Sequence, residues 1–285
     1  MRLFDAKYEL LEKLGDGGTA SIHLALSHDD GGLVVVKRLS PRLAQDALNL
    51  YYFRREYEVL SRLAIPGVPK ARAWGMVDGI PYFTMDYVAG EPLTDVVLKE
   101  RLSWKEGVEL LARAARILDA VHETGVVHGD VKPGNILVDE ARNVYLIDFG
   151  ASSKLGERPL PEEEEFIVGT PTYLSPELIS GGPGRRSRRS DIYALGVILY
   201  DLLTGRVPFD AESDTRILDR IEYADLVPPH EIALAIPRAI SDVALHALAR
   251  RPEERFASAR EFAAALSEAI SEASSAPASA GVAAA

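Results

Sequence analysis

The chain has 285 residues, of which 47% are hydrophobic and 26% are charged, as is ordinary for a globular protein with a sizeable core. It contains no cysteine, which excludes disulfides and thiolate metal sites, and its formal net charge of −11 argues against a general nucleic-acid binder. The sequence shows neither a signal peptide nor an apolar run long enough to span a bilayer.

The first part of the chain is rich in predicted strands. Alternating apolar residues predict a strand over 22–26, and the apolar run 33–37 predicts its partner across a polar hairpin turn. A further strand is expected over 81–88. One helix, over about 43–64, interrupts these strands, and Glu56 falls on the same face as its apolar stripe.

The rest of the chain is mainly helical. A capping box at Ser103 predicts the start of a long helix. The short apolar runs 136–138 and 144–147 predict short strands. Two later helices are expected over 192–203, ended by a glycine, and over 258–270, opened by a second capping box.

These elements predict an α+β fold with two lobes. The small lobe, 1–88, is an antiparallel β lobe with one helix, and the larger lobe, 89–270, is mainly helical. Residues 271–285 lack large apolar side chains and are expected to be a low-complexity tail or linker. The crevice between the lobes is the natural place for a ligand site.

A glycine-rich segment lies between the first two predicted strands. Gly15, Gly17 and Gly18 would let the backbone approach a phosphate and turn its N–H groups inward. Taken alone, the segment is explained equally well as a hairpin turn. It is not a Rossmann fingerprint, because a strand follows it rather than a helix, and it lacks the Gly-Lys-Ser/Thr of a Walker loop.

Lys37 ends the apolar run 33–37. An ammonium group there is either exposed at the strand end or, if buried, must be paired. Because Glu56 faces inward on the only helix of the small lobe, we expect the two to pair. A lysine held in this way can bind phosphate oxygens as a point charge.

The polar segment HGDVKPGN, 128–135, lies between apolar flanks. Asp130 can accept a proton from a hydroxyl, Lys132 can neutralise a phosphoryl group in transfer, and Asn135 offers an oxygen to a metal. Asp148 follows the apolar run 144–147 and is suited to bind Mg²⁺, although an Asx turn explains it when taken alone.

These motifs stand in one order along the chain: GxGGxA, VVVK, the helix glutamate, HxDxKPxN, DFG, GTxxYxSPE and SDIYALGVILYDLLTGxxPF. In this order they resemble the protein kinase superfamily, and the chain is most similar to bacterial eukaryotic-like (Hanks-type) Ser/Thr kinases. The resemblance covers roughly residues 8–268. The joint match is highly specific, although no single motif is decisive.

The resemblance implies a cytoplasmic, non-specific serine/threonine protein kinase that uses ATP with Mg²⁺, or Mn²⁺ as an alternative, on Ser/Thr hydroxyls of proteins. Lys37 would hold the α- and β-phosphates and pair with Glu56. Asp130 would accept the hydroxyl proton and Lys132 would stabilise charge. The metal ligands would be Asn135 and Asp148.

The resemblance also implies the remaining site residues. The nucleotide pocket would use the glycine lid, the sheet, a gatekeeper at Met85 and a hinge that binds adenine: Leu14, Gly15, Gly17, Gly18, Ile22, Val35, Lys37, Met85, Asp86, Tyr87, Val88, Asn135, Leu137 and Asp148. Thr170 would lie in the substrate-facing loop. Glu177 would pair with Arg255, and Asp191 would brace the catalytic loop.

The sequence departs from the family pattern in three places. Ala20 replaces the third loop glycine, where we expect a modest effect on nucleotide affinity, and SPE replaces APE at 175–177. Gly129 replaces the arginine that in most of the family receives an activation-loop phosphate. We hypothesise that activity does not depend on a phosphate held there, while Thr170 and Thr172 stay candidate autophosphorylation sites.

A run of acids, 162–165, precedes the basic run GRRSRRSD, 184–191. The two can dock on each other and order the segment, the basic run can favour acidic peptides, or both can be solvated surface, which is the simplest interpretation. For function, the main alternative is a pseudokinase that binds nucleotide and serves as a scaffold or regulatory module. We expect protein substrates, no nucleic-acid partner, no membrane span in this chain, and a monomer or weak homodimer.

Overall fold

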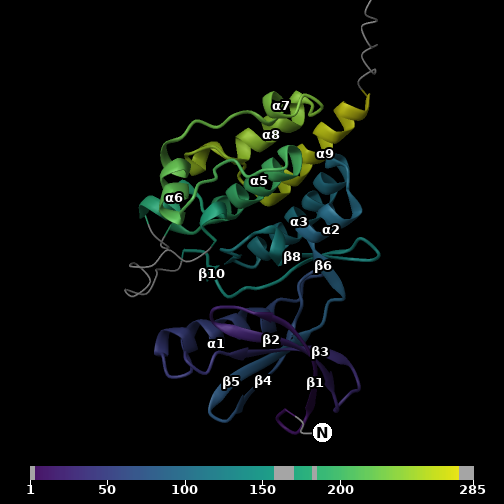
Figure 1. The fold of residues 1–285 in the computed structure, drawn as a ribbon, viewed down its shortest axis with the longest axis vertical. Coiled ribbons are helices and arrows are strands. Elements are labelled where there is room, and N and C mark those ends of the chain that lie inside the picture. The colour runs from purple at the N-terminus through teal and green to yellow at the C-terminus, as the bar shows by residue number, and fades with distance from the viewer. Residues whose placement is uncertain (1–3, 157–169, 182–184, 276–285) are drawn as a thin grey trace, which may run out of the picture.

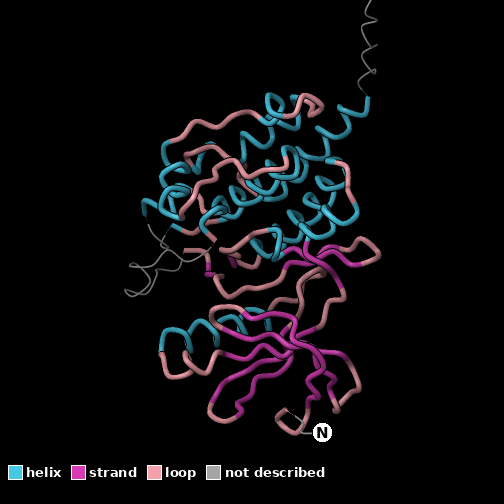
Figure 2. Tube along the Cα trace, in the orientation of Figure 1, coloured by secondary structure: helices cyan, strands magenta, loops and turns pink. Residues whose placement is uncertain are grey.

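An antiparallel sheet with one helix against it forms the small lobe (Figures 1 and 2). The computed structural model describes residues 4–156, 170–181 and 185–275. The five strands run in the order β1-β2-β3-β5-β4. Their bounds are β1 Tyr8–Asp16, β2 Ala20–Ser27, β3 Leu33–Leu39, β4 Ala71–Val77 and β5 Ile80–Asp86, with α1 at Ala47–Arg62. The predicted strands over 22–26, 33–37 and 81–88 are β2, β3 and β5.

Helix α1 packs its apolar face on the sheet. Phe53 and Leu60 are buried in one cluster with Phe83 of β5. The helix begins at Ala47 rather than at 43, because the Asp46 side chain accepts a hydrogen bond from the backbone of Asn49 at 2.8 Å and so caps the helix.

The large lobe is mainly helical and lies above the small lobe in Figure 1. Its helices are α2 Leu93–Glu100, α3 Trp104–Glu123, α4 Pro176–Gly181, α5 Arg188–Thr204, α6 Asp214–Tyr223, α7 Pro229–Ile232, α8 Arg238–Ala247 and α9 Ala259–Ser275. Short 3-10 turns span Pro133–Asn135, Pro171–Tyr173 and Pro252–Glu254. Its strands are β6 Gly90–Pro92, β7 Val126–Val127, β8 Ile136–Asp139, β9 Val144–Leu146 and β10 Ser153–Lys154. The α+β prediction with two lobes is confirmed.

Capping side chains set the ends of the long helices. The predicted capping box of Ser103 and Glu106 opens α3. Helix α5 begins at Arg188, before the predicted 192, because Ser187 and Ser190 form a capping box there that the sequence analysis did not identify. It ends at Gly205 with φ of +72°, as the glycine predicted.

Helix α9 is longer than the sequence predicted. It continues to Ser275, so the first residues of the predicted tail 271–285 are helical. Alanine and glutamate favour a helix there, and the Ser274 hydroxyl bonds back to the carbonyl of Ile270 at 2.8 Å. Residues 276–285 lie outside the described part of the chain, and the division of the lobes at 88 stays a prediction.

Candidate active site

Lys37 and Glu56 pair in the interior of the small lobe. Strand β3 presents Lys37 and helix α1 presents Glu56, and their side chains lie 2.6 Å apart. Both residues are buried. The Lys37 ammonium also donates to Asp148 at 3.0 Å, which joins the small lobe to the segment after β9. The sequence predicted the pair from the inward face of the helix, and the structure brings the two residues together.

The Lys37 ammonium lies between two carboxylates, and burial raises the pKa of one of them, Glu56, above its usual value. Burial disfavours the Lys37 ammonium, but the charges of Glu56 and Asp148 outweigh burial and raise the pKa of Lys37 above its usual value. Burial likewise disfavours the Asp148 carboxylate, but the charge of Lys37 and its hydrogen bond hold the pKa of Asp148 below its usual value. At neutral pH the site therefore presents a fixed cation beside an ionised carboxylate.

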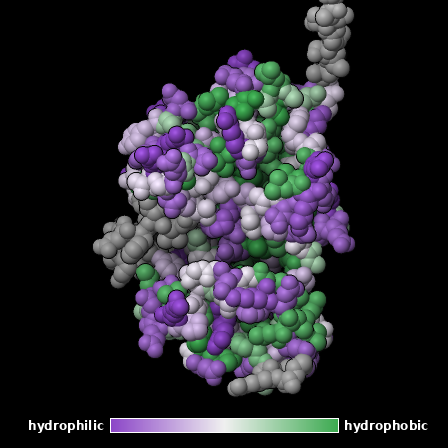
Figure 3. All heavy atoms as spheres, in the orientation of Figure 1, coloured by the Kyte–Doolittle hydropathy of each residue, from purple (hydrophilic) through white to green (hydrophobic). Residues whose placement is uncertain are grey.

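The glycine-rich turn roofs the cleft that contains this pair. Gly15 lies within β1, and Gly17 and Gly18 form the turn before β2. The backbone N–H of Gly17 donates to the carbonyl of Ala20 at 3.0 Å and so closes the turn. Gly17, Gly18 and Lys37 line one cleft together with Asp130 of the opposite lobe. Figure 3 shows the surface hollowed between the lobes.

The predicted apolar nucleotide contacts share one face of the sheet. Ile22 pairs with Lys37 across β2 and β3, and Val35 pairs with Met85 across β3 and β5. Residues directly opposite in antiparallel strands, and residues two apart in one strand, project to the same face. Leu14 lies at the bulge of β1, where the pairing with β2 shifts register.

The predicted hinge residues lie at the end of β5 and just after it, since Asp86 is the last residue of this strand. Tyr87 and Val88 connect β5 to β6. The Asp86 carboxylate accepts from the backbone of Lys70 at 3.1 Å and from Arg72 Nε at 2.6 Å, so that side chain is engaged within the small lobe. Leu137 comes from the large lobe, on β8, where it pairs with Tyr145.

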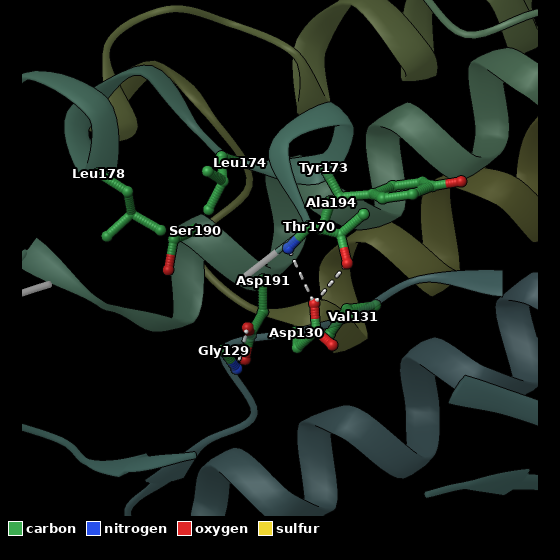
Figure 4. A pocket seen from close by; sticks show the side chains of 10 residues that line it. All are labelled: Gly129, Asp130, Val131, Thr170, Tyr173, Leu174, Leu178, Ser190, Asp191 and Ala194. Atoms are coloured by element: carbon green, nitrogen blue, oxygen red, sulfur yellow. Dashed lines mark hydrogen bonds between the residues drawn. The ribbon is translucent and has the colours of Figure 1, made fainter. Parts of the chain in front are cut away.

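The catalytic loop gathers its polar groups around Asp130. One carboxylate oxygen, Oδ2, accepts from Lys132 Nζ at 2.6 Å and from Asn135 Nδ2 at 3.2 Å. The other, Oδ1, accepts from the backbone and the hydroxyl of Thr170 at 3.2 and 3.1 Å (Figure 4). Lys132 also donates to the Thr170 hydroxyl at 3.0 Å. Thr170 thus lies beside Asp130 and Lys132.

Asp191 holds the backbone of this loop through hydrogen bonds. It lies buried in the first turn of α5, and its carboxylate accepts from the backbone N–H of His128 at 2.9 Å. It also accepts from the backbone N–H of Gly129 at 2.9 Å (Figure 4). His122 Nε2 lies 2.7 Å from the same carboxylate. Burial disfavours the charge of Asp191, but these hydrogen bonds and the neighbouring histidines hold its pKa below its usual value.

The backbone conformation at residue 129 favours glycine. Its φ is +79°, in the left-handed region that favours glycine. A Cβ atom at this position would lie 2.5 Å from the carbonyl oxygen of Ala151. A side chain here would therefore collide with the segment that follows Asp148 unless that segment shifts.

Glu177 and Arg255 form a buried ion pair in the large lobe. Two parallel hydrogen bonds of 2.8 and 2.7 Å join the guanidinium to the carboxylate. The Arg255 guanidinium also stacks over Tyr193, with 4.8 Å between its Cζ and the ring centroid. The implied pair is present, and it ties the first turn of α4 to the segment before α9.

The basic run is less solvated than the simplest interpretation held. Arg188 donates to Glu123 at 3.0 Å and to the carbonyl of His122 at 2.7 Å. Arg186 donates to the carbonyl of Ala151 at 2.8 Å and lines the cleft. The acidic run 162–165 lies outside the described residues.

Several contacts of the site carried no usable signal in the sequence. Arg72 at the hinge, His122 beneath Asp191 and Arg186 beside Gly129 were all missed. The partner of each is distant in the chain, and an isolated arginine or histidine is more often an ordinary surface or core residue. Only the density of arginine over 184–191 set one of them apart.

Comparison with known proteins agrees with this geometry. Residues 8–266 match the family model described as protein kinase domain. The chain is 31% identical over 271 residues to the probable serine/threonine-protein kinase PknB of Bifidobacterium longum, covering 91% of this chain and 39% of the relative. It is 34% identical over 264 residues to the serine/threonine-protein kinase PknB of Mycobacterium leprae, covering 90% of this chain and 42% of that relative.

The chain thus spans about two fifths of the length of these curated relatives. The matched region includes both lobes and every motif of the cleft. The resemblance to Hanks-type kinases that the motif order predicted is confirmed, and the chain belongs to the protein kinase domain family.

Proposed function

We propose that this chain is a Ser/Thr protein kinase that transfers the γ-phosphoryl group of MgATP to protein hydroxyls. The observation that carries the proposal is the contact of Lys37 with Glu56 and Asp148 in the cleft that Asp130, Lys132 and Thr170 also line. Phosphoryl transfer needs positioning and charge stabilisation more than covalent help from the protein, and this arrangement supplies both.

The cleft suits a nucleotide phosphate chain with its metal. Lys37 provides a fixed positive charge beneath the glycine turn, and Gly17 and Gly18 add no side chain to the cleft that they line. Asp148 and Asn135 would hold Mg²⁺, or Mn²⁺ in its place. Phosphate oxygens and water would supply the remaining ligands. When bound, the metal supplies charge neutralisation on the phosphates.

Asp130 would orient the acceptor hydroxyl and take up its proton. Its two oxygens are held by Lys132, Asn135 and Thr170, so the carboxylate is fixed before substrate arrives. Lys132 would neutralise charge on the group in transfer. The Lys132 contact to Thr170 supports a role for Thr170 in shaping the acceptor site for Ser/Thr side chains.

We further propose that activity does not require an activation-loop phosphate held next to Asp130. Residue 129 has no side chain to receive one, and a side chain there would have to displace the carbonyl of Ala151. The expected partners are proteins with exposed Ser/Thr, and the expected compartment is the cytoplasm, as a monomer or weak homodimer without a nucleic-acid partner. Among the described residues, none of the helices is both long and apolar enough to cross a bilayer.

A radiolabelled ATP assay with a generic basic protein substrate tests the transfer. The Asp130→Asn variant should lose about 10²–10⁴-fold in turnover while it still binds ATP, because the general base is removed and the nucleotide contacts remain. Lys37→Met provides the control that loses the phosphate contact. A wild-type chain that binds ATP but transfers no phosphate would identify a pseudokinase scaffold instead.

A further inference from the structure

Arg186 lies against the glycine that replaces the usual arginine. Its guanidinium Nη1 donates to the carbonyl oxygen of Ala151 at 2.8 Å. Its Nε lies 3.4 Å from the position that a Cβ of Gly129 would take. The guanidinium therefore packs directly on Gly129, and it reaches this place from the segment before α5 rather than from the catalytic loop.

The carbonyl that Arg186 binds belongs to Ala151, in the turn that follows Asp148. Asp148 has a left-handed backbone with φ of +62°, and the N–H of Ser152 closes the turn on the carbonyl of Phe149 at 3.0 Å. Ala151 lies within that turn. Beyond it, strand β10 pairs with β7. Arg186 and β7 thus fasten the segment after Asp148 at two successive points.

Arg186 is itself held by the start of α5. The next residue, Ser187, is the N-cap of this helix and shares a capping box with Ser190. Asp191, in the same first turn, accepts from the backbone of Gly129 at 2.9 Å. One helix terminus therefore supports Gly129 through a carboxylate and packs a guanidinium against it from the segment that leads into the helix.

We infer that Arg186 is a positioning residue that keeps the Asp148 turn in its active arrangement without a phosphate. Elsewhere in the family this task falls to a catalytic-loop arginine and a phosphorylated loop. Here Arg186 joins the helix that braces the catalytic loop directly to the segment of the metal ligand. The inference rests on the proposed phosphate-independent kinase activity.

A positioning role and a merely structural one differ in what they change. Arg186 binds the backbone of Ala151, whereas the Lys37 ammonium that would contact the phosphates is held by Glu56 and Asp148. Loss of Arg186 should therefore leave ATP binding intact and reduce the rate of transfer, because a misplaced turn carries Asp148 away from its working position. A structural bond would change stability alone.

The test compares Arg186→Ala, Arg186→Lys and Arg185→Ala, each treated with phosphatase before assay. Arg185 is the exposed neighbour of equal charge and serves as the matched control. We expect Arg186→Ala to lose about tenfold in kcat, equal to about 1.4 kcal/mol, with KM for ATP within about twofold of wild type. Arg186→Lys should recover part of kcat, because an ammonium can still donate to the carbonyl.

Two results would overturn the inference in distinguishable ways. If treated wild type is active and Arg186→Ala matches Arg185→Ala in kcat, then Arg186 is not a positioning residue. If treated wild type is itself inactive, then the proposed phosphate independence fails and the inference falls with it. An increase in KM for ATP alone, with kcat unchanged, would also contradict the inference, since that pattern reports lost nucleotide binding.

Discussion

Replacement of Gly129 by alanine tests how the catalytic loop is held. Alanine at this position must keep a backbone φ of +79°, and its methyl group would lie 2.5 Å from the carbonyl oxygen of Ala151. That oxygen belongs to the backbone and is already bonded to Arg186, so it cannot move aside without breaking this contact. The substitution therefore combines backbone strain with a steric clash.

The two costs can be separated with glycines nearby. Left-handed backbone costs a non-glycine residue about 1–2 kcal/mol, and overpacking adds about 1–3 kcal/mol, so Gly129→Ala should lose about 2–5 kcal/mol in the free energy of unfolding. Gly125 has φ of +80° but no atom within 4 Å of the position that a Cβ would take, so Gly125→Ala should lose only the first part. Gly134→Ala, with neither feature, should stay within about 1 kcal/mol of wild type.

Urea denaturation of the three variants measures these free energies, and the kinase assay follows turnover beside it. Gly129→Ala should also lose turnover, because residue 129 precedes Asp130 and contacts the Asp148 segment. Gly125→Ala, at the end of α3, should not. If Gly129→Ala is no less stable than Gly125→Ala, the close approach to Ala151 does not constrain the loop and the reasoning is wrong.

Two further predictions concern the large lobe. Arg255→Met should lower the free energy of unfolding by about 3–5 kcal/mol, because it leaves the Glu177 carboxylate buried without its cation. Arg251→Met breaks an exposed pair and should change the free energy of unfolding far less; equal losses in urea denaturation would contradict the role of the buried pair. The pKa of Asp191 is lower in the folded protein than in the unfolded chain, where it is about 3.9. The ionised carboxylate therefore stabilises the fold at pH values above about 3.9, and this contribution is lost as the pH falls through the pKa of the folded state. Asp191→Asn should therefore flatten the loss of stability below about pH 4, and an unchanged slope would count against the hydrogen bonds from His122 and the loop.

The sequence was informative where local pattern and chemistry coincide. Glu56 on the inward face of a helix required a cation, and Lys37 on the neighbouring strand was its only candidate. The capping box at Ser103 opened a helix where it predicted one. The capping side chains lie within a few residues of the helix end that they set. For the ion pair, only one cation was available on a neighbouring predicted strand.

The sequence was uninformative where the contact depends on tertiary placement. Gly129 was seen only as a missing arginine, since its φ and the approach of Ala151 arise from the packing of two distant segments. Arg186 was one of several arginines in a basic run, and nothing local separated it from exposed Arg185. The end of α9 was misplaced because Ala- and Ser-rich composition suits both a helix and a linker.

We propose that this kinase works without an activation-loop phosphate. The most direct measurement is the initial rate of phosphoryl transfer by protein shown to be unphosphorylated by intact mass, with Asp130→Asn as background. We expect transfer from the first turnover, with no lag and no gain after preincubation with MgATP. A lag that shortens with preincubation, or activity that is absent until Thr170 or Thr172 is phosphorylated, would contradict it.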